Sequence, residues 1–157
     1  MAAGDIRSLG SIFVTTDIIL SFDSATTLTE GDLVNLQNGE LQLADGGENI
    51  LGQILEDATS ASTGVQVNAT PGLVIVMDND EVGGAFPSTS AGEFFDIIGA
   101  TGAQLVDTSS SAAGETTGSS GQLLCLAYNP QGVGVDSDTS YGKFLIKEHQ
   151  LFGGAAV

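Results

Sequence analysis

Glycine and short turn sequences interrupt this chain so often that long helices are disfavoured. The 157 residues include 22 glycines, and short apolar or β-branched runs lie between stretches rich in Gly, Ser and Thr. No long apolar stripe recurs with the 3.6-residue period of a helix, whereas several short runs alternate apolar and polar residues as half-buried strands do. The pattern predicts an all-β protein: a small barrel or sandwich of short antiparallel strands with Gly/Ser/Thr-rich loops and extended termini.

The clearest unit is GDLVNLQNGELQLADGGENILGQILED, residues 31–57. Asn38-Gly39 predicts a two-residue hairpin turn, because both turn positions require residues that tolerate a positive φ. The run after DGG supplies a third strand, in which Gly52 marks a bulge or a close approach of two backbones. Pro71-Gly72 predicts a corner between two further strands, and we expect the second of these, residues 73–77, to help close the barrel.

A single domain accounts for a chain of this length. We assign residues 1–11 to an extended N-terminal arm, 12–151 to one β domain and 152–157 to a C-terminal tail. Within the domain, residues 28–78 are the expected compact barrel-like core. Residues 107–121, DTSSSAAGETTGSSG, have low complexity and no core-forming side chain, which predicts an exposed loop.

The charge of the chain is strongly one-sided. The chain has twenty acidic residues and three basic ones, Arg7, Lys143 and Lys147, which gives a formal net charge of −17. Such a surface repels nucleic-acid backbones and anionic membranes, which proteins bind through Lys and Arg, so we expect neither as a partner. The acidity favours solubility of crowded copies, and adaptation to a salty medium is a compatible alternative.

The chain contains no segment typical of membrane insertion or secretion. No apolar run approaches the roughly 20 residues that span a bilayer. The first 20 residues, MAAGDIRSLGSIFVTTDIIL, are interrupted by Asp17 and do not match a signal peptide. We therefore expect a soluble protein that is either cytosolic in origin or released by a route that needs no leader. The single cysteine, Cys125 in LLCLAY, is interpreted as a small buried hydrophobe.

Catalytic motifs are absent from the sequence. His149 is the single histidine, no serine lies in a G-x-S-x-G elbow, and no GxxxxGK[ST] loop occurs. One His and one Cys cannot fill a tetrahedral zinc site within one chain. We predict that the protein is not an enzyme and has no catalytic residues and no cofactor. A small hydrolase built around His149 is kept as an alternative.

Carboxylates gather where an apolar run ends in PGLVIVMDNDEVGG. Asp78 and Asp80 match positions 1 and 3 of an EF-hand loop, but position 5 would be Val82 and position 12 Thr89, so the motif fails. Asp78, Asp80 and Glu81 are candidate Ca²⁺ ligands outside that motif, and a Ca²⁺-dependent surface-layer domain is the matching functional alternative. A solvated strand end is the interpretation we prefer.

The segment GDLVNLQNGELQLADGGENILGQILEDATSASTGVQVNATPGLVIVM resembles the small β-domain of tailed-phage capsid decoration, or cement, proteins. The matching positions are Gly31-Asp32 with Val34, Leu51-Gly52, and Val65, Val67 and Gly72. They correspond to a "GD-V" strand, an "LG" strand and a strand pair with two alternating valines and a following glycine. The resemblance covers residues 28–78, about a third of the chain.

This resemblance implies a structural, non-catalytic bacteriophage virion protein. Proteins of the family bind the outer surface of an assembled capsid, often as homotrimers, and stabilise the head by bridging capsid subunits. The implied partners are the major capsid protein and copies of the chain itself. The implied location is the outer capsid surface of the virion, after synthesis in the host cytoplasm. Another virion surface module, such as a tail, fibre or adhesin-type binding domain, is the main alternative.

Family members commonly dock through an extended terminal arm. In this chain the resemblance assigns that arm to GDIRSLGSIF, where one cation lies among apolar side chains. Such a segment is suited to binding by strand addition. The candidate capsid-binding residues are Ile6, Arg7, Leu9, Ile12 and Phe13.

Overall fold

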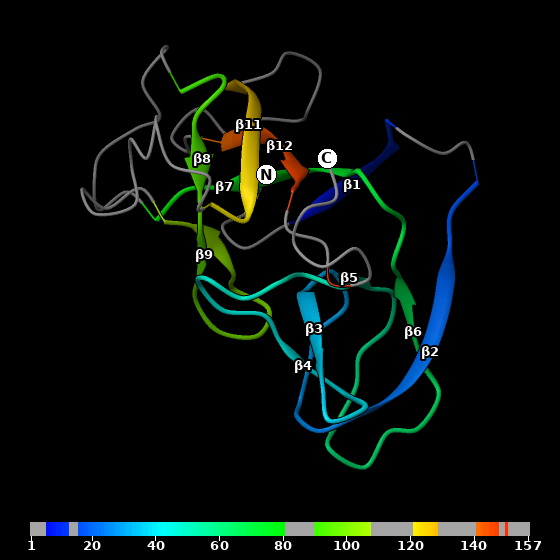
Figure 1. Ribbon diagram of the computed structural model, residues 1–157. Helices are drawn as coiled ribbons and strands as arrows, with labels where there is room; N and C mark the ends of the chain where they lie inside the picture. The colour runs from blue at the N-terminus through cyan, green and yellow to red at the C-terminus, as the bar shows by residue number, and fades with distance from the viewer. Residues whose placement is uncertain are drawn as a thin grey trace.

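The computed structural model describes residues 6–12, 16–80, 90–107, 121–128, 141–147 and 150. Within these residues the secondary structure consists of twelve strands, which confirms the predicted all-β class. The strands form a closed barrel, an open sheet and a two-stranded ribbon, and the barrel lies below the open sheet in the view of Figure 1. No helix among the described residues has the length and apolar character needed to cross a membrane.

Five strands close the barrel in the order β2-β4-β3-β5-β6. They are β2 (Ile19–Ser24), β3 (Leu33–Gln37), β4 (Glu40–Leu43), β5 (Gly52–Ile54) and β6 (Val65–Asn68). The β2–β4 pair is parallel, and the other neighbouring pairs are antiparallel. Inward-facing side chains fill the barrel, as in small barrels generally. This buried cluster consists of Leu28, Val34, Leu41, Leu51, Ile54, Ala58, Val65, Val67 and Ala69.

Two local features of the barrel follow the sequence prediction. Asn38 and Gly39 both have positive φ, 54° and 88°, and join β3 to β4 as a two-residue turn with Gln37 opposite Glu40. Gly52 is a point of close backbone approach, because a Cβ there would overlap the Asn68 carbonyl group. Both features are set by neighbouring residues or by one tight contact, which is why the sequence pattern predicts them.

The open sheet has the order β1-β7-β12-β11-β8, with all neighbours antiparallel. Its strands are β1 (Arg7–Ser11), β7 (Leu73–Asp78), β8 (Phe94–Phe95), β11 (Leu123–Tyr128) and β12 (Tyr141–Ile146). The remaining strands, β9 (Ile97–Ile98) and β10 (Leu105–Val106), pair with each other. An isolated bridge between Asn79 and Val106 joins this ribbon to the end of β7.

The position of β7 corrects the expected limits of the barrel. The barrel strands span residues 19–68, whereas β7 lies in the open sheet between β1 and β12. All six residues of β7 are buried, as expected of an internal strand that is covered on both faces. The corner at Gly72, where φ is 68°, separates β7 from β6, and β7 leaves the barrel there.

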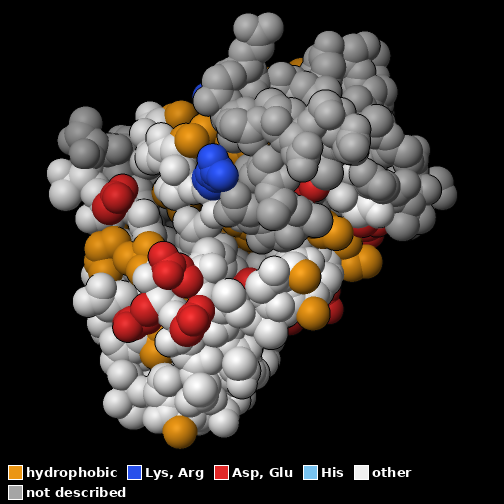
Figure 2. Space-filling model, turned by 180° about the vertical axis from the view of Figure 1, so that it is seen from behind, with side chains coloured by type: hydrophobic (Ala, Val, Ile, Leu, Met, Phe, Trp, Pro, Cys, Tyr) orange, Lys and Arg blue, Asp and Glu red, His pale blue; other side chains and the backbone are white. Residues whose placement is uncertain are grey.

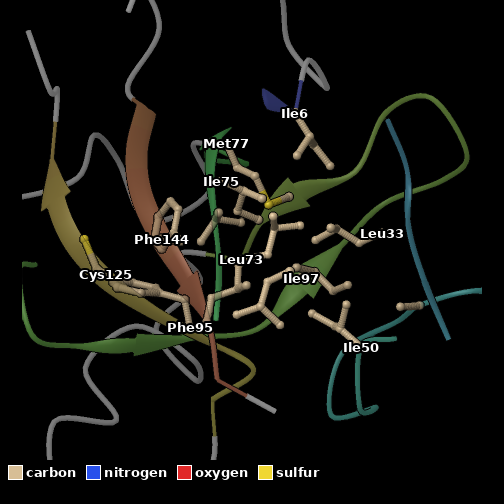
Figure 3. Close-up of a cluster of buried hydrophobic side chains, with 14 residues drawn as sticks. Ile6, Leu33, Ile50, Leu73, Ile75, Met77, Phe95, Ile97, Cys125 and Phe144 are labelled. Carbon is tan, nitrogen blue, oxygen red and sulfur yellow. The ribbon is translucent and has the colours of Figure 1, made fainter. Parts of the chain in front are cut away.

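A second buried cluster joins the barrel to the inner face of the open sheet. Leu33 and Ile50 come from the barrel half, and they lie beside Leu73 and Ile97 in Figure 3. The rings of Phe95 and Phe144 meet edge to face with their centroids 6.0 Å apart. Because residues of both halves contribute to this cluster, it packs the two halves together, and we call it the shared core.

Buried polar side chains also tie the halves together. The Asp32 carboxylate accepts hydrogen bonds from the Thr29 N–H (2.8 Å), the Thr101 hydroxyl (2.6 Å) and the Gly102 N–H (2.7 Å). Thr29 lies in the barrel half, whereas Thr101 and Gly102 lie between β9 and β10. The Asp of the "GD" motif therefore anchors the ribbon to the barrel.

Candidate interaction surface

Strand β1 is an edge of the open sheet. It pairs with β7, with Arg7 opposite Val76 and Ser8 opposite Ile75, and its register shifts before Ser11. Among the described strands, β7 is the single neighbour of β1. Edge strands are the usual places where an extended segment of another chain adds to a sheet.

This arrangement corrects the expected free arm. Residues 7–11 form a strand on the body of the protein, and Ile6 is only 8% exposed and belongs to the shared core. Its carbonyl oxygen accepts a hydrogen bond from Gln53 Nε2 at 3.1 Å. Burying an isoleucine side chain contributes about 1.5–3 kcal/mol, which favours the docked strand over an extended arm.

Three of the five candidate arm residues reach the surface. Arg7 is exposed, and Leu9 and Ile12 have exposed fractions of 48% and 56%. The Ile12 N–H donates to the Gly72 carbonyl at 3.2 Å, which fixes the segment just after β1. Phe13 lies outside the described residues. The surface around β1 therefore combines two exposed apolar side chains with a cation.

Two of the three basic residues lie in one row across the sheet. Arg7 and Lys143 are both register partners of Val76, so all three side chains project from the same face. The neighbouring row contains Ile75 and Phe144, which face the shared core. Because successive residues of a strand alternate in direction, the Arg7 row faces away from that core.

Lys147 extends the same basic face. Its Nζ lies 4.3 Å from the ring centroid of Phe94, a cation–π contact. Phe94 is opposite Leu124, which in turn is opposite Leu145, two residues after Lys143. All three cations of the chain therefore lie on the outer face of the open sheet.

The barrel half has the opposite charge. No Lys or Arg occurs between Ser8 and Gly142, so every charged side chain of the barrel is acidic. Figure 2 shows Asp and Glu side chains over the barrel half, whereas the basic side chains visible in this view lie on the sheet half. The molecule is thus polarised, with its cations on one sheet and an acidic barrel.

The candidate Ca²⁺ ligands are not grouped by the described structure. Asp78 ends β7 and is only 3% exposed, and its Oδ1 accepts the Asn79 N–H at 2.9 Å. The Asp80 N–H donates to the Val106 carbonyl at 3.0 Å. Glu81 lies outside the described residues, among which no group of three His, Cys, Asp or Glu residues could hold a metal.

The burial of Asp78 also corrects the preferred interpretation of a solvated strand end. Asp78 is opposite Tyr141 of β12, which is itself buried, so the end of β7 lies inside the sheet. The acidic run therefore begins in the interior, where β7 meets β10, and not in solvent.

The remaining chemical candidates give no site among the described residues. His149, on which the hydrolase alternative depends, lies outside them. Cys125 is buried, as its apolar surroundings in sequence predict. Desolvation raises the pKa of its thiol to about 11, with a smaller increase from Glu93 and an opposing effect of a backbone hydrogen bond at Ala127. A thiol with so high a pKa is unreactive at neutral pH.

Sequence reasoning missed a cavity of about 480 Å³ at the rim of the barrel, lined by Glu30, Asp57 and neighbouring residues. Asp57 Oδ1 accepts the Glu30 N–H at 2.8 Å across 27 positions of sequence. No local motif marks this pair, because the two acids come together through closure of the barrel.

Comparison of the chain with models of protein families and with curated proteins finds no match.

Proposed function

We propose that this protein is a structural component of a phage virion, which binds the outer surface of the assembled capsid and stabilises it by bridging capsid subunits without catalysis. The observation that carries this proposal is the position of β1 at the edge of the open sheet. The exposed side chains of Leu9 and Ile12 lie close in sequence to Arg7, which shares a row with Lys143. The resemblance of residues 28–78 to capsid decoration proteins supplies the class of partner.

The proposed contact is addition of a strand to β1. An extended segment of the major capsid protein would pair with the outer edge of β1, and main-chain hydrogen bonds would provide affinity. Leu9 and Ile12 would bury apolar surface against that segment. Acidic side chains on the capsid would lie near Arg7 and Lys143, so the contact requires a partner that is less acidic than the barrel but carries some carboxylates.

The charge polarity favours one orientation on the capsid. With the sheet half toward the shell, the acidic barrel faces solvent and repels the barrels of neighbouring copies. Because of this repulsion, copies would contact one another only through surfaces that are complementary in shape and charge. A homotrimer would require such surfaces.

Stabilisation would follow from mass action. A ligand that binds the assembled state and not the free subunits stabilises that state in proportion to the logarithm of its concentration relative to Kd. A trimer that engages several subunits at once gains effective concentration, so modest contacts suffice.

The test is a binding experiment with undecorated heads and unassembled capsid subunits from the same source. We expect co-sedimentation of the protein with heads, weaker binding to free subunits and a higher temperature of head disruption. Equal affinity for heads and subunits, or no gain in the heat resistance of the heads, would contradict the proposal.

A pair of matched variants locates the contact. Ile12→Asp places a charge at the β1 edge, and we expect it to weaken head binding at least roughly tenfold. Ile98→Asp makes the same change at another exposed isoleucine, in β9, and should leave binding unchanged. Equal losses in both variants would place the contact elsewhere.

A further inference from the structure

We propose that the cavity at the barrel rim binds a basic alkyl group, that is, a hydrocarbon chain that ends in an ammonium or guanidinium group. This inference is independent of the proposed capsid contact, which lies at the edge of β1.

The charge of the cavity favours a cation. Glu30 and Asp57 both line it, and its described lining residues include no Lys or Arg. Asp57 uses Oδ1 to accept the Glu30 N–H, which holds the two residues together and leaves Oδ2 as a further acceptor. Both residues are exposed at the barrel rim, and two carboxylates at one site attract a cation more strongly than a single one does, because their potentials add.

A buried amide provides a second and independent acceptor. Gln53 is only 5% exposed, yet it lines the cavity, so the part of it that remains accessible faces that space. Its Nε2 donates to the carbonyls of Ile6 (3.1 Å) and Gly31 (3.0 Å), which fixes the orientation of the amide. Among the described residues no donor bonds Gln53 Oε1. Oε1 is not one of the buried side-chain atoms that lack a partner, so water can reach it from the cavity, and an entering N–H group would take the place of that water.

The apolar part of the lining suits an alkyl chain. Ile6, Ile54 and Leu55 line the same cavity, and Leu55 is 38% exposed. Long basic side chains place their methylene groups along apolar surface and their charged ends on polar groups, which matches this distribution. The volume of about 480 Å³ lies in the usual range for small-ligand sites.

A divalent metal fits the cavity less well. Calcium takes six to eight oxygen ligands in proteins, whereas the side chains of the lining offer two carboxylates, one amide oxygen and the Thr29 hydroxyl beside apolar groups. An ammonium or guanidinium group needs only a few acceptors in its vicinity, and Arg and Lys bind carboxylates through such charge-assisted hydrogen bonds.

The experiment titrates the full-length protein, labelled with ¹⁵N, with three probes in low salt. Nα-acetyl-lysine amide represents a basic side chain of a protein partner, spermidine represents a free polyamine, and Nα-acetyl-norleucine amide is the neutral control. We expect saturable shifts of the Gln53 side-chain amide and the Glu30 N–H with at least one basic probe, and none with the norleucine probe. Whichever basic probe binds more tightly identifies the source of the ligand.

Matched variants separate a built site from general attraction to an acidic surface. The double variant Glu30→Gln/Asp57→Asn keeps the size of both side chains, and the amide oxygen introduced at position 57 can still accept the backbone N–H of residue 30. We expect its Kd for the preferred probe to rise at least roughly tenfold. Glu40→Gln removes one charge from an exposed residue outside the cavity and should change Kd less than about twofold.

Three outcomes would overturn the inference. They are no saturable binding of either basic probe, equal binding of the norleucine probe, and an equal loss of affinity in Glu40→Gln and the double variant. Head binding measured on the same double variant keeps the two proposals apart, because the β1 contact predicts no change there.

Discussion

Glutamine side chains complete the hydrogen bonding of β3 beyond the ends of its neighbouring strands. Gln104 accepts the Leu33 N–H at 2.7 Å and donates to the Leu33 carbonyl at 3.0 Å and the Ala44 carbonyl at 2.9 Å. Gln150 accepts the Leu36 N–H at 2.6 Å and donates to the Leu36 carbonyl. The pairing of β4 with β3 ends at Leu43 opposite Val34, and β5 pairs with β3 only at Leu33 and Val34. The two amides therefore supply partners that longer neighbouring strands would otherwise provide.

Replacing Gln104 should therefore destabilise the protein well beyond the loss of one contact. Gln104→Leu leaves the Leu33 N–H without its acceptor in a buried position, and we expect the free energy of unfolding to fall by about 2–4 kcal/mol. Urea unfolding followed by circular dichroism measures the change. Gln66→Leu, at an exposed position of β6, is the control and should stay within about 0.5 kcal/mol of the parent. Equal stability of the two variants would contradict this role for Gln104.

At this scale the sequence predicts residues whose role is local. The Asn38-Gly39 turn can be predicted because the turn conformation itself restricts which residues are allowed. The role of Gln104 cannot be predicted, because its partner Leu33 lies 71 positions away and an isolated glutamine belongs to no periodic pattern. The cavity cannot be predicted for the same reason, because neither Glu30 nor Asp57 belongs to a distinctive sequence motif.

Close contact between β5 and β6 leaves no room for a side chain at residue 52. Gly52 begins β5, and a Cβ at this position would lie 2.8 Å from the Asn68 carbonyl carbon and overlap its oxygen. Both of these atoms belong to the backbone, so no side-chain rotation can relieve the overlap. The two strands approach closely enough to complete the barrel because residue 52 has no side chain.

Gly52→Ala should consequently open or strain the barrel. We expect a loss of more than about 2 kcal/mol in the free energy of unfolding, because the backbone of β6 must move. Gly39→Ala is the comparison: it has open space around its Cβ but a φ of 88°, and should cost about 1–2 kcal/mol from conformation alone. Thermal unfolding of both variants gives the order, and a Gly52→Ala variant as stable as Gly39→Ala would show that β5 and β6 can separate freely.

Strand existence is easier to infer from the sequence than strand partnership. The apolar run 73–77 predicts a buried strand, but its continuous burial fits either a barrel or an open sheet, and it forms β7 of the sheet. Likewise, the alternation of Ile6 with Arg7 is compatible with an arm or a strand. The pairing of β1 with β7 joins segments far apart in the chain, such as Arg7 and Val76, and periodicity contains no information on such distant partners.

Charge polarity is the property that belongs to the molecule as a whole. The three cations lie on the outer face of the open sheet, and the barrel carries acids alone. Composition predicts the magnitude of the net charge, but the fold determines that the cations converge on one face. Both proposals depend on this division, since the capsid contact uses the basic face and the cavity lies in the acidic half.

The net charge of −17 should make stability depend on ionic strength, because repulsion among the acids destabilises the compact state. The Debye length falls from about 30 Å at 0.01 M to about 3 Å at 1 M salt, so NaCl should screen most of this repulsion. We expect the melting temperature to rise by about 3 °C or more over that range, since 1 kcal/mol corresponds to about 2–4 °C for a chain of this size. CaCl₂ at matched ionic strength is the control: an equal rise indicates screening alone, whereas a larger rise at low concentration indicates specific binding of Ca²⁺. A melting temperature that stays constant or falls with NaCl would contradict this prediction. It would mean that repulsion among the acids is already offset in the folded state. The separation of the three cations from the acidic barrel would then have little influence on stability.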